Sequence, residues 1–269
     1  MFVHSVQRCV IWSVVVLFCG QLDAQSTPVS IGGVSVQLQP PTLNGTENET
    51  QQIEKLSPMI GGLSMRQFTR DSQVAPVRID LKYIKDDSGN RVGHLVHVLF
   101  VVHCPLERFA EGQLSQQLSG EVETDDSETS SFAKPVDEVT LRENGVQSIE
   151  DNQRFRHIQT TLLDKIKLDA VLRIDTHKSP QQNRIDLLLD DRFAAQWTST
   201  EDPKQTGTYT GFQAWLTATK LAGADAVVIE SRLAMHEPPE WFSGSNFIRS
   251  KLPLVLQQTA RDLRRKLAD

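Results

Sequence analysis

The chain has 269 residues, a formal net charge of −6 and 39% hydrophobic residues. The acidic balance excludes a general nucleic-acid binder, because such a protein presents a net basic face to the phosphates. The length suffices for one large domain, or for one domain with a tail.

The N-terminus has the pattern of an export signal. Arg8 precedes an apolar stretch at residues 9–20, and polar sequence follows Ala24. The stretch is shorter than the roughly 20 residues that a membrane span needs. We therefore expect residues 1–24 to be a signal peptide, and the mature protein to be secreted or periplasmic without a transmembrane span. Two alternatives stay open: an uncleaved anchor, since Leu22 is bulky for a cleavage site, and lipid attachment at Cys19.

Cleavage after residue 24 would leave Cys104 alone, so the mature chain has no internal disulfide and depends on its core. Residues 25–75 are rich in Ser, Thr, Gln, Pro and Gly, with weak periodicity. This composition predicts a flexible N-terminal segment that is dispensable for folding. Residues 76–269 are expected to form a single α+β domain. Within it, residues 121–151 carry ten acidic side chains against Lys134 and Arg142 and predict an acidic loop.

Alternating apolar residues predict an antiparallel sheet. Residues 76–84 alternate as a half-buried strand, and residues 91–104 are apolar on both faces, so the pair predicts a hairpin whose second strand is central. A short helix is expected from Pro105 onwards. Four further strands with turn-like connections, between residues 165 and 237, predict a meander. No βαβ alternation occurs, which argues against a doubly wound sheet.

The C-terminal stretch predicts a long amphipathic helix. Its apolar residues recur at spacings of three and four, and its end is basic. Pro253 indicates either a kink or a helix that starts there. A basic amphipathic helix can lie on anionic membranes, but the apolar sheet before it favours packing. Arg264 and Arg265 are expected at the exposed end, where reversing their charge costs little. The apolar stripe comprises Ile248, Leu252, Val255, Leu256, Ala260, Leu263 and Leu267.

The order of a last strand (residues 226–237), a Pro-Pro link and a helix with Leu-Pro near its start resembles the START-like, or helix-grip, superfamily. The long acidic excursion departs from that pattern. The whole chain also resembles uncharacterised exported bacterial proteins. The START-like resemblance implies a curved antiparallel sheet packed against a long C-terminal helix, with a cavity for a lipid-like molecule between them. The cavity walls it implies are Phe100, Leu172, Leu187, Trp215, Ile229, Val255 and Leu263.

No pattern in the sequence indicates catalysis, a cofactor or a metal. His94 and His97 face opposite sides of their strand, while His97 and His103 are about 20 Å apart along it, so one metal cannot join them. Serine-hydrolase, phosphate-loop and dinucleotide motifs are absent from the sequence. Cys104 follows a buried-type strand, which favours a packed thiol over a nucleophile.

Several further side chains leave alternatives open. Asp190 and Asp191 favour a solvated strand end over acid-base work. Arg173, Glu230 and Arg232 could anchor a ligand, but facing water is favoured. The leading hypothesis is an exported protein that binds a hydrophobic or amphipathic small molecule. The alternative is a non-catalytic envelope interaction or structural protein with a filled core and an unidentified protein partner.

Overall fold

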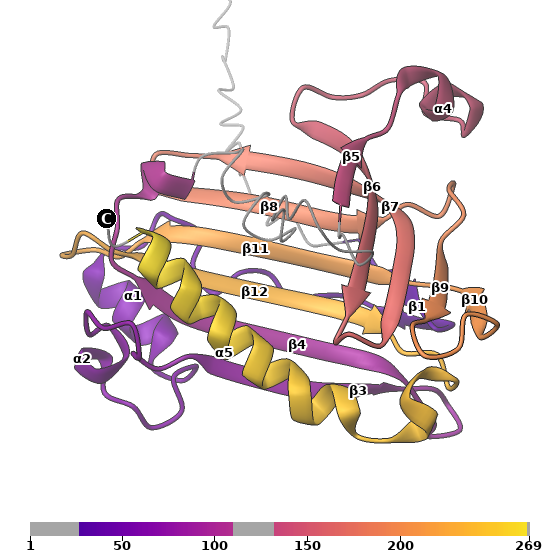
Figure 1. Ribbon diagram of the computed structural model, residues 1–269. Coiled ribbons are helices and arrows are strands. Elements are labelled where there is room, and N and C mark those ends of the chain that lie inside the picture. Colours follow the sequence, from indigo (N-terminus) through magenta and orange to yellow (C-terminus); the bar gives the residue numbers. More distant parts are fainter. Residues whose placement is uncertain (1–26, 110–131, 268–269) are drawn as a thin grey trace, which may run out of the picture.

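The computed structural model describes residues 27–109 and 132–267. Its centre is an antiparallel sheet crossed diagonally by the long helix α5 (Phe247–Leu267), drawn in yellow in Figure 1. The strand order is β10-β9-β7-β8-β11-β12-β4-β3, with β6 paired to β7 and β5 paired to β6. The strands are β3 (Arg78–Lys85), β4 (Arg91–Val102), β5 (Phe132–Pro135), β6 (Gln153–Leu162), β7 (Ile166–Lys178), β8 (Gln182–Leu189), β9 (Gln196–Ser199), β10 (Thr206–Thr208), β11 (Phe212–Lys220) and β12 (Val227–His236).

The strands predicted from alternation are confirmed. β3 and β4 pair as a hairpin, and β4 lies between β3 and β12. β7, β8, β11 and β12 are successive antiparallel neighbours, which is the expected meander. The sequence pattern missed β6, because between Phe155 and Leu162 it carries mostly Arg, His, Gln and Thr. It also missed the short strands β9 and β10, whose turn-rich residues predicted a loop.

The two faces of the sheet belong to different cores. Val98 and Phe100 of β4 join the core that includes Ile248 and Leu252 of α5, and we call this side the inner face. Leu99 and Val101 point the other way, to the outer face, as strand alternation requires. The α+β fold with a long helix packed on the sheet is therefore confirmed.

The helix begins at Phe247 and contains Pro253 inside it, so the alternative of a helix starting at the proline is wrong.

The sheet bends around the beginning of α5. β7 pairs with β8 over Leu172–Lys178 but with β9 over Ile166–Asp169, so the first part of β7 leaves the main sheet. Trp197 of β9 meets Trp241 of the short helix η2 (Trp241–Gly244) edge to face at 6.1 Å. Ile166 and Trp197 share one core with α5, so the bend contributes to enclosing the helix.

Residues 27–75 are packed against the outer face, which corrects the expectation of a flexible segment. They contain β1 (Val29–Ile31), β2 (Val34–Val36), α1 (Glu49–Leu56) and α2 (Met65–Phe68). Ile31, Leu56 and Phe68 are each 0% exposed. The prediction failed because the anchoring residues are widely spaced along the chain, so each fills its own site without producing a periodic pattern.

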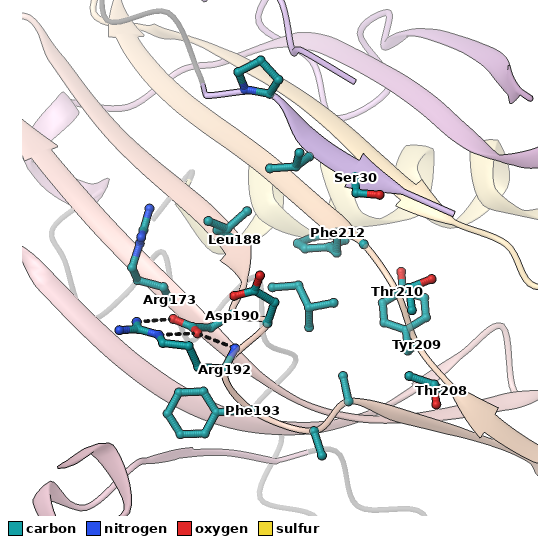
Figure 2. Close-up of a pocket in the computed structure, with 17 residues that line it drawn as sticks. Ser30, Arg173, Leu188, Asp190, Arg192, Phe193, Thr208, Tyr209, Thr210 and Phe212 are labelled. Carbon is teal, nitrogen blue, oxygen red and sulfur yellow. Dashed lines mark hydrogen bonds and ion pairs between the residues drawn. The ribbon is translucent and has the colours of Figure 1, made fainter. Parts of the chain in front are cut away.

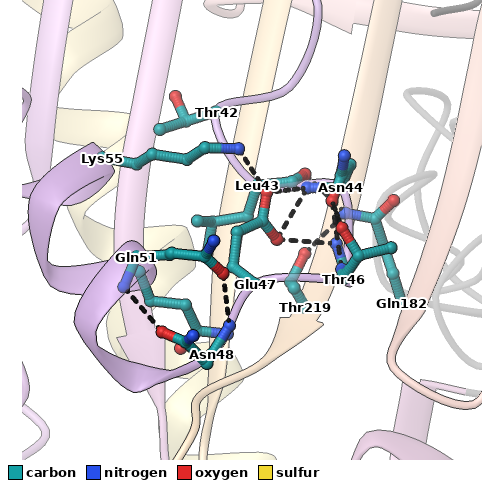
Figure 3. Close-up of polar contacts among 12 residues, drawn as sticks. Thr42, Leu43, Asn44, Thr46, Glu47, Asn48, Gln51, Lys55, Gln182 and Thr219 are labelled. Carbon is teal, nitrogen blue, oxygen red and sulfur yellow. Dashed lines mark hydrogen bonds and ion pairs between the residues drawn. The ribbon is translucent and has the colours of Figure 1, made fainter. Parts of the chain in front are cut away.

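Polar contacts fix the same segment (Figure 3). Gln182 of β8 donates to the Leu43 carbonyl oxygen at 2.7 Å and to the Thr219 hydroxyl at 2.8 Å. Asn48 and Gln51 close a reciprocal capping box at the start of α1, which satisfies backbone N–H groups that the helix itself leaves unpaired. The segment therefore has both apolar and polar attachments to the sheet.

Some predictions lie outside the described residues: the signal peptide at 1–24, residues 121–131 of the acidic loop, and the expected helix beyond η1 (Leu106–Phe109). The rest of the acidic loop contains β5 and α4 (Glu138–Glu143). Leu141 and Val146 are buried there against Phe155, so these two side chains anchor this half of the loop, while most of its other residues are exposed, as expected. In the described ranges, no helix is long and apolar enough to cross a membrane.

Candidate functional site

A cavity of about 690 Å³ lies at the strand ends of β8 and β11 (Figure 2). We call it the strand-end cavity. Residues 188–195 and 208–212 form most of its wall, and Pro28, Val29 and Ser30 of the N-terminal segment close one side. Its size falls within the roughly 300–1,000 Å³ of small-molecule sites.

The position of the cavity gives it two kinds of wall. Leu189 and Phe212 belong to the inner-face core that α5 covers. Leu188 and Arg173 alternate with them and point to the outer face, where they also contribute to the cavity. Because the cavity lies where two strands end, it receives apolar side chains from one face of the sheet and charged ones from the other.

The charged wall is organised by Asp190 and Arg192. Arg192 donates Nε to Oδ1 at 2.8 Å and Nη2 to Oδ2 at 2.6 Å, and its backbone N–H adds a bond to Oδ1. Burial would raise the pKa of Asp190, but these hydrogen bonds and the positive charge of Arg192 hold it below its ordinary value. The predicted solvated strand end is therefore wrong for Asp190, which is 5% exposed.

The apolar wall is backed by stacked rings. Tyr209 lines the cavity and stacks on Trp241 with centroids 5.6 Å apart and planes 3° apart. Burial raises the pKa of the Tyr209 hydroxyl. A neutral, packed phenol therefore forms part of a stacked aromatic surface.

A second cavity of about 760 Å³ adjoins the first on the outer face. The two share Pro28, Val29, Arg173 and Leu188. Its wall contains two ion pairs formed within single strands, Arg173 to Asp175 in β7 and Arg184 to Asp186 in β8. Arg173 thus stands between the cavities, and Leu188 contributes the apolar surface common to both.

Five of the seven predicted wall residues lie on the inner face of the sheet or on the side of α5 that faces it. Phe100 and Ile229 lie on the inner face at 6% and 1% exposure, where they fill the core beneath α5. Leu187 and Leu263 are partly buried against the same core, and Leu172 is 9% exposed at the register position of Leu189.

Two of the predicted wall residues do not face the sheet–helix interior. Trp215 is buried on the outer face, in the cluster that holds Ile31 and Leu38. Val255 is 48% exposed, because it lies on the side of α5 that faces away from the sheet. The helix period allowed Val255 to be grouped with the stripe, but the stripe is narrower than the sequence pattern suggested.

The strand-end cavity itself was not predicted from the sequence. It uses Leu189 from one segment and Tyr209 and Phe212 from another, and the two segments carry no common motif. The one available signal is the Asp-Asp-Arg sequence at residues 190–192, which by itself is typical of a solvated strand end.

The histidines do not converge, and no group of side chains in the described ranges could hold a metal ion. The Nε2 atom of His94 lies 2.5 Å from Glu237, which Arg91 also binds. His97 contacts Glu230 at 2.9 Å, whereas His103 contacts a backbone carbonyl oxygen.

Glu230, favoured as water-facing, is 2% exposed and accepts bonds from the backbone and hydroxyl of Thr42. Its carboxylate therefore anchors the N-terminal segment. Arg173 and Arg232 also lie on the outer face, where Arg173 lines both cavities and Arg232 donates to Gln39 at 2.6 Å.

No protein-family model and no curated protein matches the chain. Among solved structures, human STARD10 is similar at 11% identity, covering 80% of each chain with a TM-score of 0.40. CalU16 from Micromonospora echinospora is similar at 7% identity, covering 72% of this chain and 96% of its own, with a TM-score of 0.26. These are distant likenesses in fold.

Proposed function

We propose that this protein binds a hydrophobic or amphipathic small molecule, lipid-like in character. The observation that carries the proposal is the strand-end cavity, whose walls are apolar on one side and charged on the other. An amphipathic molecule satisfies both walls, since its apolar part removes Leu189 and Phe212 from water while its polar part stays beside Arg173 and Arg192.

The apolar wall of the cavity is continuous with the inner-face core, which Leu189 and Phe212 join. Leu189 stands opposite Leu172 in the register of β7 and β8, and Leu187 stands opposite Ile174. Leu187, Leu189 and Ile174 are partly buried and share the inner-face core.

Native mass spectrometry of the protein purified from its source tests the proposal. We expect an added mass that organic solvent removes, and uptake of a fluorescent fatty-chain probe by the stripped protein. Phe212→Ser should weaken probe binding by about tenfold or more, because it removes a large part of the apolar wall. Phe132→Ser is the matched control, since Phe132 is also a partly exposed phenylalanine on a strand but lies outside the cavity.

Absence of both the added mass and probe uptake would favour the alternative, an interaction or structural protein with a filled core. Equal loss of probe binding in the two variants would place the probe outside the strand-end cavity.

We propose further that the protein is exported, on the basis of the apolar stretch at residues 9–20 and the small residue Ala24. N-terminal sequencing of the protein from its source should begin at Gln25. Retention of Met1 would refute cleavage and favour an anchor.

A further inference from the structure

The side of α5 that faces away from the sheet carries a continuous strip of exposed cationic and apolar residues. Positions 254, 258, 261 and 265 follow one another at spacings of four, three and four, which places them on one side of a helix with 3.6 residues per turn. All are exposed, as are the neighbouring positions 251 and 255. The outer strip consists of Lys251, Leu254, Val255, Gln258, Arg261 and Arg265.

The strip is strongly basic on an acidic protein. It contributes three cations, and the adjacent acidic side chain, Asp262, pairs with Arg265 at 2.9 Å. Among the described residues, Lys251 and Arg261 have no carboxylate partner within ion-pair distance. The chain as a whole carries a net charge of −6, so the basic residues of the strip are not part of a generally basic surface.

Two large apolar residues interrupt the cations. Leu254 is 59% exposed and Val255 is 48% exposed, and they are adjacent on the same helix. The core under the helix does not include these two residues, because Ile248, Leu252 and Ala260 on the sheet-facing side already fill it. An exposed apolar pair flanked by cations is complementary to a surface with anionic groups outside and an apolar layer beneath them.

Further cations lie beside the C-terminal end of the strip. Burial lowers the pKa of Arg264, and the positive charges of Arg70, next to α2, and of Arg261 lower it further. Such like charges repel one another, and an external anionic surface would relieve that repulsion.

We propose that the outer strip of α5 docks on the surface of a bilayer that contains anionic lipids. Lys251, Arg261 and Arg265 contact the headgroups, and Leu254 and Val255 enter the interfacial layer. The opposite side of the helix stays packed on the sheet, so docking requires no unfolding. A nucleic acid would meet the cations but not the apolar pair, and therefore fits the strip less well.

Sedimentation with vesicles tests this inference without any bound small molecule. We expect the protein purified from its source to bind vesicles of phosphatidylcholine mixed with phosphatidylglycerol, and to bind vesicles of phosphatidylcholine alone at least about tenfold more weakly. Raising the salt concentration should weaken the binding, as screening requires.

Arg261→Gln together with Arg265→Gln should reduce binding to the anionic vesicles about twenty-five-fold, taking about fivefold for each basic residue near the surface. The matched control is Arg142→Gln together with Lys204→Gln, which removes the same charge from exposed positions elsewhere. Leu254→Ser with Val255→Ser should weaken binding to anionic vesicles while leaving its salt dependence unchanged. Inorganic phosphate should not compete at the concentration of lipid phosphate, because a single ion does not engage the whole strip.

The proposal is overturned if the unchanged protein binds both kinds of vesicle equally or binds neither. It is also overturned if the strip variant and its charge-matched control bind alike, because total charge would then explain the effect. Competition by inorganic phosphate would assign the arginines to a small-anion site instead of a membrane surface. Circular dichroism of each variant establishes that the fold is retained.

Discussion

Replacing Arg264 should destabilise the protein far more than replacing its neighbour Arg265. Arg264 was expected at an exposed helix end, but it is 5% exposed. Its Nε donates to the Val101 carbonyl oxygen at 2.9 Å, and its Nη1 donates to that of Ala75 at 2.8 Å. Longer bonds reach the carbonyl oxygens of Gln73 and Pro76. The side chain therefore joins α5, the end of β4 and the segment before β3.

The magnitude follows from the two short bonds. A hydrogen bond to a charged donor contributes about 1.5–3 kcal/mol, so the pair accounts for about 3–6 kcal/mol. Burial lowers the pKa of Arg264 to about 10, with a smaller contribution from Arg70 and Arg261, which means that the buried charge itself opposes folding. Arg264→Ala removes that opposing effect but leaves buried carbonyl oxygens unpaired. We expect a net loss of about 3 kcal/mol in the free energy of unfolding.

Urea denaturation followed by circular dichroism measures this loss. Arg264→Lys should recover only part of it, because an ammonium group lacks the planar fork that reaches several carbonyl oxygens at once. Arg265→Ala is the control; its side chain is 63% exposed and pairs with Asp262 three residues away, so about 0.5 kcal/mol or less is expected. The reasoning would be refuted if the free energies of unfolding of Arg264→Ala and Arg265→Ala differed by less than about 1 kcal/mol.

Four further predictions concern other parts of the fold. Leu256→Asp, on the sheet side of α5, should lower the free energy of unfolding in urea by several kcal/mol. Leu254 is 59% exposed, so Leu254→Asp should lower it by about 0.5 kcal/mol or less. Equal effects would contradict the assigned orientation of the helix. Asp190 has a folded-state pKa below its ordinary value of 3.8, so its carboxylate stabilises the fold above that pH and loses this effect as the pH falls. The loss of stability caused by Asp190→Asn should therefore become smaller on acidification. A loss that does not change with pH would contradict this. Burial raises the pKa of Cys104 to about 11, so iodoacetamide at mild alkaline pH should modify this thiol only after unfolding, which mass spectrometry of the modified peptide can check. A shortened chain that starts at Pro76 should lack a cooperative melting transition, because removing the buried side chains of the N-terminal segment leaves the outer face uncovered. A retained transition would show that the segment is dispensable.

The sequence was sufficient to predict the long strands and α5 because their signal is local. Alternation along β3 and β7, and the spacing of Ile248, Leu252 and Ala260, each report one face of one element. The hairpin and the meander followed from short connections between successive strands. These features need no knowledge of what the element packs against.

The attachment of the N-terminal segment could not be predicted in that way. Ile31, Leu43 and Phe68 fill separate places on the outer face and have no common spacing. Glu230 shows the same limit for polar residues, since alternation placed it on a strand but could not reveal that Thr42, 188 positions away, covers and binds it. Both cases depend on contacts between distant segments.

The strand-end cavity could not be predicted from the sequence for a related reason. Its walls depend on three features at once: the register of β8 against β7 and β11, the path of the loop after Leu189, and the position of Pro28 beside that loop. Each contributing residue alone is typical of a core or a turn. Composition cannot distinguish a residue that fills space from one that borders it.

The packing of α5 explains why the strand-end cavity lies where it does. Ile248, Leu252 and Ala260 are 1%, 8% and 1% exposed, so the helix fills the space over the strands that it crosses. Phe212 and Leu189 lie further along the inner face, where the strands end and β9 and β10 turn away. There the two side chains are only partly buried, so a bound apolar molecule would add to their packing. A ligand at this position would stabilise the fold without displacing α5. Loosening the helix by Leu256→Asp should therefore act mainly on unfolding, and removing the apolar wall by Phe212→Ser should act mainly on binding.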